Sequence, residues 1–429
     1  MSSVMTSTRE ADMTAVDPHP ALTVQPGRAG SGFWTVAYAL LIVMAFATLP
    51  SPLYGLYRTR DHLSSFVITV VFAIFAGGTI TTLLAVPRIA ARIGRRGVML
   101  AAVAFMMTAA GLLAAWKALP ALFIGRLLAG ASAGLAAGTA ITYLIELRLR
   151  ADPKASMIRA RNIGTSVNVG ALGVGPLVAG ALAQWAKWPL TVPYLVWLGL
   201  GAIALAGLWF VPETGAPASG VVSSTSGAGA APARLPIPAA AGTFSAFAAS
   251  GLFAGLAGVF LATTLHHPAH ALSGATLFLV FSAGVVSQLV TSRFRASTVL
   301  ALGTAGMLGG LVLLVISVRL SNPNLAMFLA SGALIGAGLG TVFKGTTGIV
   351  LEAAAPESRL AMTSALLIAL YVGLSIPVVG AGVALNQGAT APNTVLGFAI
   401  LVALGVSLSG WALVRRRPGR TESSQSDPR

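Results

Sequence analysis

The chain has 429 residues, of which 56% are hydrophobic and only 9% are charged, and its formal net charge is +16. A mean hydropathy of +0.84 excludes an ordinary set of soluble domains. The absence of cysteine excludes disulfides, thiolate metal sites and cysteine nucleophiles. The positive charge does not predict nucleic-acid binding, because the basic residues are spread over short segments between apolar runs.

Residues 1–32 are polar and rich in Ser, Thr and Pro. This composition matches neither a cleavable signal peptide nor a membrane span, and predicts a disordered N-terminal tail.

Apolar runs follow, each long enough to cross the roughly 30 Å hydrocarbon core of a bilayer as a helix. They are continuously apolar, unlike the alternating strands of a membrane barrel. We therefore predict an all-α, multi-pass membrane protein with twelve transmembrane helices, over residues 33–57, 65–89, 98–116, 120–145, 162–184, 189–211, 241–264, 271–292, 298–318, 324–350, 360–384 and 393–414.

Basic residues separate these runs unevenly. With both termini cytoplasmic, 20 of the 27 Lys and Arg residues face the cytoplasm, and two lie inside runs. Only five face outward: Arg58, Arg60, Lys117, Lys187 and Arg319. Because Lys and Arg are retained on the cytoplasmic side, this asymmetry predicts cytoplasmic termini in a plasma or inner membrane.

The segment after the second run reads RIAARIGRRG, from Arg88 to Gly97. Gly94 permits a sharp turn, and the guanidinium groups can reach lipid phosphates or the carbonyls at helix ends. The alternative is a basic loop that serves topology alone.

This segment resembles the signature loop of the major facilitator superfamily, whose conserved positions match Arg92, Gly94, Arg95 and Arg96. Pro87 and Ala91 depart from the pattern, where the family has a glycine and an aspartate. In the family that aspartate belongs to a charge relay which closes the cytoplasmic side. The resemblance therefore implies a gating loop with an incomplete latch, made of Arg88, Ala91, Arg92, Gly94, Arg95 and Arg96.

The fourth run contains GRLLAGASAG, from Gly125 to Gly134. A charge such as Arg126 inside a span is costly and should face a cavity or a partner, unless it snorkels to the outer interface. The stretch resembles the family's fourth-helix motif, whose arginine is implicated in proton coupling or substrate binding. Its Gly-Ala-Ser-Ala-Gly also fits a hydrolase elbow, but an elbow needs a strand before it, so we expect helix packing.

The fifth run contains Gly175, Pro176 and Gly180, which resemble the antiporter signature of drug:proton exporters in the same superfamily. Proline kinks a helix and glycine lets a neighbour approach closely. Ala171 and Ala179 replace glycines of that signature, so plain helix packing is an equal alternative.

Residues 212–240 are rich in Gly, Ala, Ser and Pro, as in a flexible linker, and they divide the runs six and six. The two sets echo each other at an offset of about 201 residues, since Pro176 corresponds to Pro377 and Arg92 to Arg293. Parallel repeats of this kind build rocking transporters. We predict six-helix bundles over residues 33–211 and 241–414, related by a pseudo-two-fold axis, and a basic cytoplasmic tail over residues 415–429.

Further polar residues in or near the runs are weaker candidates for a transport pathway. They are Lys344, Asn168, Gln288, Tyr38, Tyr54, Tyr143 and Tyr371. Glu146 with Arg150, and Glu352 with Arg359, could form ion pairs at cytoplasmic helix ends, or could be solvated there. His266, His267 and His270 are read as a solvated loop rather than a metal site, because no carboxylate lies near them in the sequence.

Each of the eleven acidic residues falls in a tail, a loop or the end of a run. A buried carboxylate is the usual proton carrier of proton-coupled transporters. Proton coupling is therefore implied by the family resemblance alone, with Asp61 and Glu146 as the best carboxylate candidates.

We predict a monomeric secondary transporter that works by alternating access and exports a small lipophilic compound, with a coupling proton, membrane lipids around it and no cofactor. One alternative is an uptake symporter for a sugar or an organic acid, since Val211-Pro212-Glu213-Thr214 is similar to sugar-porter loops. A membrane-embedded enzyme or sensor is a remote alternative, because the sequence has no catalytic constellation.

Overall fold

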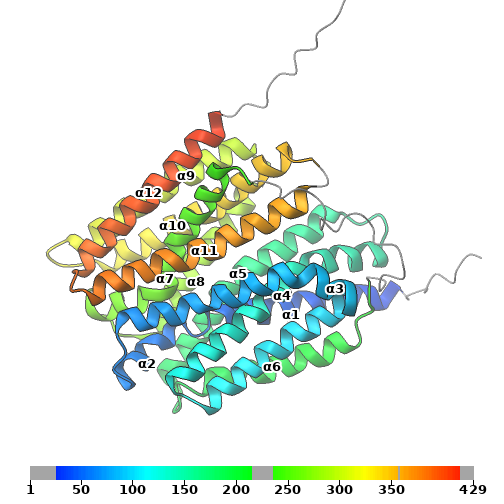
Figure 1. Ribbon diagram of the computed structural model, residues 1–429, viewed down its shortest axis with the longest axis horizontal. Helices are drawn as coiled ribbons and strands as arrows, with labels where there is room; N and C mark the ends of the chain where they lie inside the picture. The colour runs from blue at the N-terminus through cyan, green and yellow to red at the C-terminus, as the bar shows by residue number, and fades with distance from the viewer. Residues whose placement is uncertain (1–25, 215–234, 356–357, 416–429) are drawn as a thin grey trace, which may run out of the picture.

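The computed structural model describes residues 26–214, 235–355 and 358–415. The regular structure within these ranges is helical, and eleven segments are long and apolar enough to cross a membrane (Figure 1). This confirms the prediction of a multi-pass helical protein. Most of the predicted N-terminal tail, linker and basic tail lies outside the described residues.

The described residues before the first gap, 26–214, are here called the N-terminal half and contain seven helical segments. They are α1 (Pro26–Thr48), the 3-10 turn η1 (Ser51–Leu53), α2 (Tyr54–Arg60), α3 (Ser65–Ala115), α4 (Leu119–Ala151), α5 (Met157–Trp185) and α6 (Val192–Trp209). α1 begins earlier than the first predicted run, at Pro26. It ends where Pro50 and Pro52, which lack backbone N–H groups, prevent the helix from continuing.

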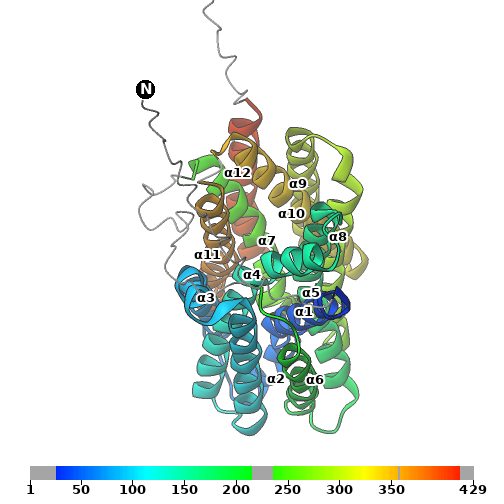
Figure 2. The same ribbon diagram turned by 90° about the vertical axis from the view of Figure 1, so that its right-hand side faces the viewer.

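The described residues 235–355 and 358–415 are here called the C-terminal half, and they also contain seven helical segments. They are α7 (Ile237–Thr263), α8 (His270–Val290), η2 (Thr291–Arg293), α9 (Ala296–Arg319), α10 (Leu325–Ala353), α11 (Arg359–Asn386) and α12 (Ala391–Arg415). Figures 1 and 2 show the two halves on opposite sides of the molecule.

α3 spans 51 residues and covers two of the predicted runs, residues 65–89 and 98–116. Its regular geometry breaks at Gly94, which has φ 74° and ψ 174°. This backbone conformation is essentially restricted to glycine. The break divides α3 into a first segment, residues 65–93, and a second segment, residues 95–115.

Contacts with α4 give the direction of the first segment. Gly130 of α4 packs on the backbone of Phe75, and Gly134, one turn later, packs on Thr79 and Thr82. A Cβ atom on Gly130 would lie only 2.0 Å from the Phe75 carbonyl oxygen. The two helices therefore run in the same direction, in close contact through small residues.

The second segment runs the opposite way. Gly125 of α4 packs on Leu113, whereas Ser132, two turns later, donates a hydrogen bond of 2.6 Å to the earlier carbonyl of Ala102. The chain therefore reverses direction at Gly94, and α3 consists of two antiparallel helices, each of span length.

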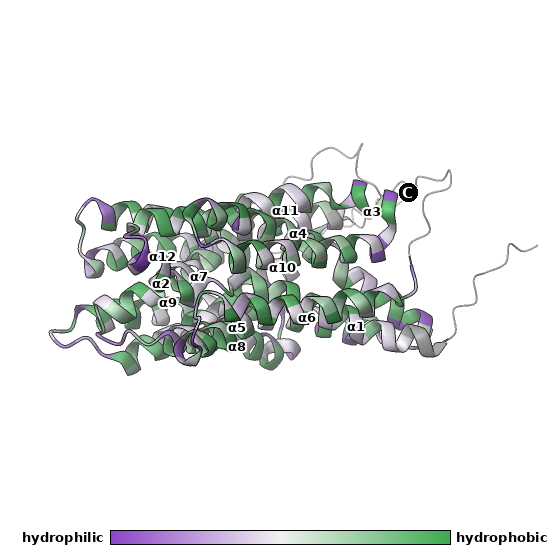
Figure 3. Ribbon diagram, turned by 90° about the horizontal axis from the view of Figure 1, so that it is seen from below, coloured by the Kyte–Doolittle hydropathy of each residue, from purple (hydrophilic) through white to green (hydrophobic). Residues whose placement is uncertain are grey.

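Polar residues gather at the two ends of the molecule, and apolar residues fill the length between them (Figure 3). We call one end the basic end, defined by Arg88, Arg92, Arg95, Arg96, Arg148, Arg150, Lys154, Arg159, Arg161, Arg293, Arg295, Arg359 and Arg415. The other, here called the opposite end, carries Arg58, Arg60, Lys117, Lys187 and Arg319.

The two halves approach each other through α5 with α8 and α3 with α11. A Cβ on Gly180 of α5 would lie 2.5 Å from the His270 carbonyl oxygen of α8, and one on Gly382 of α11 would meet Thr69 of α3. Nearer the middle, the rings of Phe75 and Tyr371 lie 6.1 Å apart. These close approaches run from the opposite end to about the middle of the molecule.

Candidate functional site

Arg126 of α4 is buried in the N-terminal half, with a relative exposure of 1%. Its Nη1 donates a hydrogen bond of 2.6 Å to the carbonyl oxygen of Ala47, and its Nη2 a long one of 3.5 Å to that of Phe72. The guanidinium carbon lies 4.6 Å from the ring centroid of Phe75 and 5.6 Å from that of Phe72. The side chain therefore does not snorkel.

The carbonyl of Ala47 lies in the last turn of α1, where carbonyls lack a partner within the helix. A cation at a helix C-terminus is favourable, because the partial negative charge of the helix dipole is concentrated there. Arg126 thus caps α1 from α4.

Arg126 has no carboxylate partner among the described ion pairs. Its Nε is buried without a hydrogen-bond partner, and so is the hydroxyl of Tyr54. Nearby, the hydroxyls of Tyr57 and Tyr194 lie 3.4 Å apart. A buried charge without a counter-ion costs several kcal/mol, so its presence points to function rather than to stability.

The two aromatic rings over Arg126 also face the C-terminal half. Phe72 lies 3.8 Å from the position of a Cβ on Gly255 of α7, and Phe75 packs edge-on against Tyr371 of α11. The rings therefore separate the guanidinium from the interface between the halves.

The small residues after Arg126 serve helix packing, as the sequence predicts. Gly130 and Gly134 face the backbone of α3, and Ser132 lies in the interior of α4, bonded to a carbonyl. No strand precedes it in the described chain, so the elbow geometry is missing.

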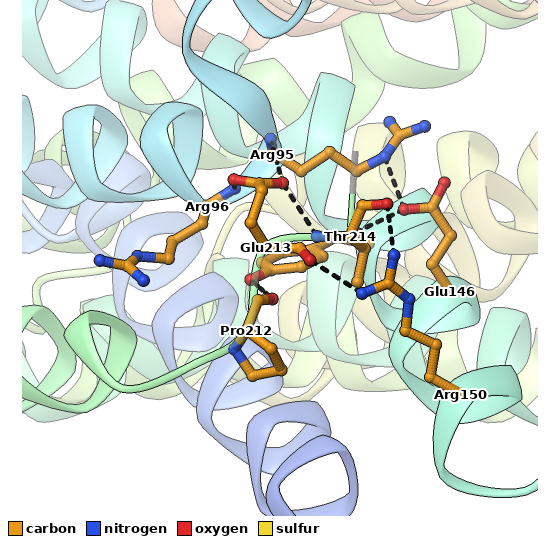
Figure 4. A network of polar contacts seen from close by, with 8 residues as sticks. Arg95, Arg96, Glu146, Arg150, Pro212, Glu213 and Thr214 are labelled. Atoms are coloured by element: carbon orange, nitrogen blue, oxygen red, sulfur yellow. Dashed lines mark hydrogen bonds and ion pairs between the residues drawn. The ribbon is translucent and has the colours of Figure 1, made fainter. Parts of the chain in front are cut away.

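A second polar group lies at the basic end, where the second segment of α3 begins (Figure 4). Glu213 accepts hydrogen bonds from the backbone N–H groups of Arg95, at 2.9 Å, and Arg96, at 3.0 Å, one on each carboxylate oxygen. It caps the helix N-terminus that the break at Gly94 exposes. The carboxylate comes from the residues after α6, more than a hundred positions away.

Glu146 and Arg150 of α4 complete this network, which joins α3, α4 and the start of the linker. The Nε of Arg95 lies 2.6 Å from Oε2 of Glu146, which also accepts a 2.6 Å hydrogen bond from the Thr214 hydroxyl. Arg150 donates to the carbonyl oxygens of Glu213 and Thr214, at 2.8 Å each.

The predicted gating loop is divided by this network. Gly94, Arg95 and Arg96 belong to it, whereas Arg88, Ala91 and Arg92 are exposed. In the sequence, Glu213 stands out only as part of Val211-Pro212-Glu213-Thr214, which is similar to sugar-porter loops. The available signal was its place, directly after the sixth apolar run in Val-Pro-Glu-Thr.

The sequence of residues 36–294 matches a family profile, that of the Major Facilitator Superfamily. The chain belongs to this superfamily. No curated protein sequence matches it. Among solved structures, the nucleoside transporter NupG, determined as a point mutant, has a TM-score of 0.67 and 10% sequence identity, covering 89% of this chain and 98% of its own. At this identity the likeness is one of fold. As a member of the superfamily, the chain is a membrane transporter of small molecules.

In this facilitator the antiporter-like residues pack at two helix crossings. A Cβ on Gly175 would lie 1.8 Å from the Ala45 carbonyl oxygen of α1. The carbonyl of Pro176 meets Gly274 of α8, and Gly180 meets His270. The last two contacts join the halves, so the motif lies on the surface that must separate if the halves move.

The remaining transport candidates are dispersed over the facilitator. Lys344 donates a 2.6 Å hydrogen bond to the Gln288 carbonyl, which ties α10 to α8, and Asn168 of α5 has a buried amide oxygen without a partner. Tyr38 donates to the Leu200 carbonyl at 3.2 Å and Tyr143 to the Pro212 carbonyl at 2.9 Å. Asp61 pairs with its neighbour Arg60, at 2.7 Å.

Proposed function

We propose that this facilitator is a secondary active transporter that exports a small, largely apolar compound by alternating access. It would have twelve membrane spans in two six-helix bundles, with both termini in the cytoplasm. The two antiparallel segments of α3 support the count of twelve. The excess of Lys and Arg at the basic end supports the orientation.

The buried Arg126, under rings that face the other half, is the observation that carries this proposal. A charge with only carbonyl and ring partners near the interface of two helical bundles marks a transport pathway. In the proposed orientation the halves meet on the extracellular side, so this arrangement corresponds to an inward-open state. Rocking about the middle would then expose the same region to the other side.

Proton coupling is part of the proposal and rests on the family resemblance and on the antiporter-like residues of α5. Each of the two candidate carboxylates, Asp61 and Glu146, lies within 2.7 Å of an arginine nitrogen. Release of such a pair during the cycle would free a carboxylate to take up a proton.

Export is tested in efflux-deficient cells by the accumulation of a panel of lipophilic compounds, with and without an uncoupler. We expect lower accumulation of at least one compound with the wild-type protein than with Arg126→Ala, and loss of that difference with the uncoupler. Equal accumulation for every compound in both strains would overturn the export proposal.

The second candidate function is uptake of an organic acid. Arg126 carries a buried positive charge with no acidic partner among the described residues, and an organic anion would neutralise it. Substrate-dependent uptake into whole cells decides between the two functions. The panel also contains sugars, and nucleosides, because the fold neighbour is a nucleoside transporter.

A further inference from the structure

At the opposite end, a cavity of about 650 Å³ lies between the two halves. Its walls are residues 52–63 of the N-terminal half, around η1 and α2, and residues 258–273 of the C-terminal half, where α7 ends and α8 begins. We call it the bridging cavity. Its volume is in the range of small-molecule sites.

The polar lining of the bridging cavity favours an anion. Arg58 contributes a positive charge, and no acidic side chain is among the lining residues. The neighbouring Asp61 is engaged by Arg60, through two hydrogen bonds of 2.7 and 2.9 Å. A bound anion would therefore meet a cation that has no carboxylate beside it in the cavity wall.

The first turn of α8 adds to this preference. It lines the cavity through His270 and Ser273, and α8 is long enough, at 21 residues, to carry a helix dipole with its positive end here. Ser273 has a relative exposure of 4%, and its hydroxyl has no hydrogen-bond partner. Buried hydroxyls are almost always bonded, so an unpartnered one in a cavity wall indicates a missing acceptor or donor.

The rest of the lining is apolar, with Leu56 and Leu63 on one side and Val259 and Pro268 on the other. We propose that the bridging cavity binds a small amphipathic carboxylate. Its charged group would lie between Arg58 and the first turn of α8, and its hydrocarbon part against the apolar walls.

Such a ligand would contact both halves at a place where α8 already connects them. The backbone N–H of His270 donates a 2.9 Å hydrogen bond to Gln184 of α5, and its ring interacts with the carbonyl of Pro52. A ligand that binds only when these walls are together stabilises the closed arrangement of this end. This second part of the inference rests on the proposed function, because it assumes that the halves separate here.

Binding is measured with purified full-length protein in nanodiscs of phosphatidylcholine, with octanoate as the probe and octanol as the neutral control. We expect octanoate, but not octanol, to raise the unfolding temperature of the wild-type protein. Arg58→Gln should weaken octanoate binding at least tenfold. Lys187→Gln, which removes an exposed charge at the same end of the molecule but outside the cavity, should leave it unchanged.

A second variant tests the cavity without changing the charge of Arg58. Nothing lies within 4 Å of a Cβ placed on the cavity residue Gly55, so Gly55→Leu should fold and fill the cavity. We expect it to abolish octanoate binding without lowering the unfolding temperature. Octanol binding as tightly as octanoate, or undiminished octanoate binding in both Arg58→Gln and Gly55→Leu, would overturn the proposal.

The choice of lipid distinguishes two anions that could occupy the cavity, a small carboxylate and the phosphate of a lipid headgroup. If nanodiscs of phosphatidylglycerol abolish octanoate binding, the occupant is a lipid headgroup and the assignment to a small carboxylate is overturned. Unchanged binding in both lipids supports it.

The stabilisation of the closed arrangement by the ligand is measured separately. Because the chain lacks cysteine, Gly382→Cys combined with Thr69→Ala, which removes the hydroxyl that the new side chain would meet, provides a single thiol at the buried contact between α11 and α3. We expect octanoate to slow maleimide labelling of this thiol at least threefold. If octanoate binds but the labelling rate is unchanged, the ligand does not stabilise the closed arrangement, whereas the binding site itself is still supported. Failure of the transport assays would not affect the binding result.

Discussion

Burial of the single residue Arg126 has two opposing effects on stability. Its contact with Ala47 at the C-terminus of α1 stabilises the fold by about 1–2 kcal/mol. The desolvation of an unpaired charge costs several kcal/mol, so the net effect of the side chain on stability is unfavourable. A residue that lowers stability is retained for what it does in the transport cycle.

Replacing Arg126 by methionine should therefore separate stability from activity. We expect Arg126→Met to unfold at the same or a higher temperature than the wild type, while transport falls at least tenfold. Thermal unfolding in detergent and transport in proteoliposomes measure the two quantities. Arg126→Lys keeps the charge but not the planar fork, and should also lose activity. A marked drop in unfolding temperature in Arg126→Met would mean that the residue is structural.

Glu213 supplies the loop around Gly94 with a carboxylate. Ala91 stands where the superfamily has an aspartate, and it is exposed. The carboxylate that binds this loop comes instead from the chain after α6, and it accepts two backbone N–H groups and lies beside Gly94.

The Glu213 cap predicts the effect of two substitutions. Glu213→Gln should lower the free energy of unfolding by about 1–3 kcal/mol, because it loses the charge and one of two acceptor oxygens. Gly94→Ala should cost about the same, since its φ of 74° is unfavourable and a Cβ would lie 2.4 Å from Glu213. Chemical denaturation measures both. Glu352→Gln, which changes an exposed carboxylate at the end of α10, is the control and should leave stability unchanged.

At the scale of helices, glycines set how closely the elements approach. Gly175 lets α5 pack directly on the backbone of α1, and Gly130 does the same for α4 on α3. These contacts hold the short C-terminal turn of α1, with Ala47, against the arginine of α4. Small residues are thus what brings Arg126 to its partners.

Gly175→Ala tests this packing. Its Cβ would clash with a backbone oxygen at 1.8 Å, so α5 or α1 must shift, at a cost of about 1–3 kcal/mol. Gly199→Ala in α6, where nothing lies within 4 Å of the new atom, should be neutral or stabilising. The changes in unfolding temperature, relative to the wild type, should therefore differ in sign or size between the two variants. Equal effects would show that α5 and α1 do not pack this closely.

At the scale of the whole molecule, the halves meet from the opposite end to about the middle. Alternating access requires these contacts to break once in each cycle. The contact between α3 and α11 is one of them, because a Cβ on Gly382 would lie 3.0 Å from that of Thr69.

A disulfide across this contact should arrest the cycle. We expect Thr69→Cys with Gly382→Cys to cross-link on mild oxidation, since the two Cβ positions lie 3.0 Å apart, about 0.5 Å closer than in a disulfide, and no native thiol competes. Transport should be lost in the oxidised protein and regained with a reductant. Each single variant serves as the control. Full transport by the cross-linked protein would exclude separation of the halves at this end.

The helical membrane architecture, the family and the charged residues that stand out from the apolar runs could all be predicted from the amino-acid sequence. Apolar runs and the distribution of Lys and Arg are local properties, and the bilayer imposes length and polarity on each span separately. The resemblance of Arg92, Gly94, Arg95 and Arg96 to a signature loop is equally local. It led to the superfamily that the profile of residues 36–294 shows.

The partners of those charges, in contrast, depend on how the helices pack together. Arg126 could have snorkelled, and Glu146 could have paired with Arg150, but α1 and the start of the linker supply other partners. The contact of Glu213 with Arg95 and the bridging cavity join segments more than a hundred residues apart. A continuous apolar helix does not reveal which of its faces contacts a neighbour, because lipid and protein interior are equally apolar.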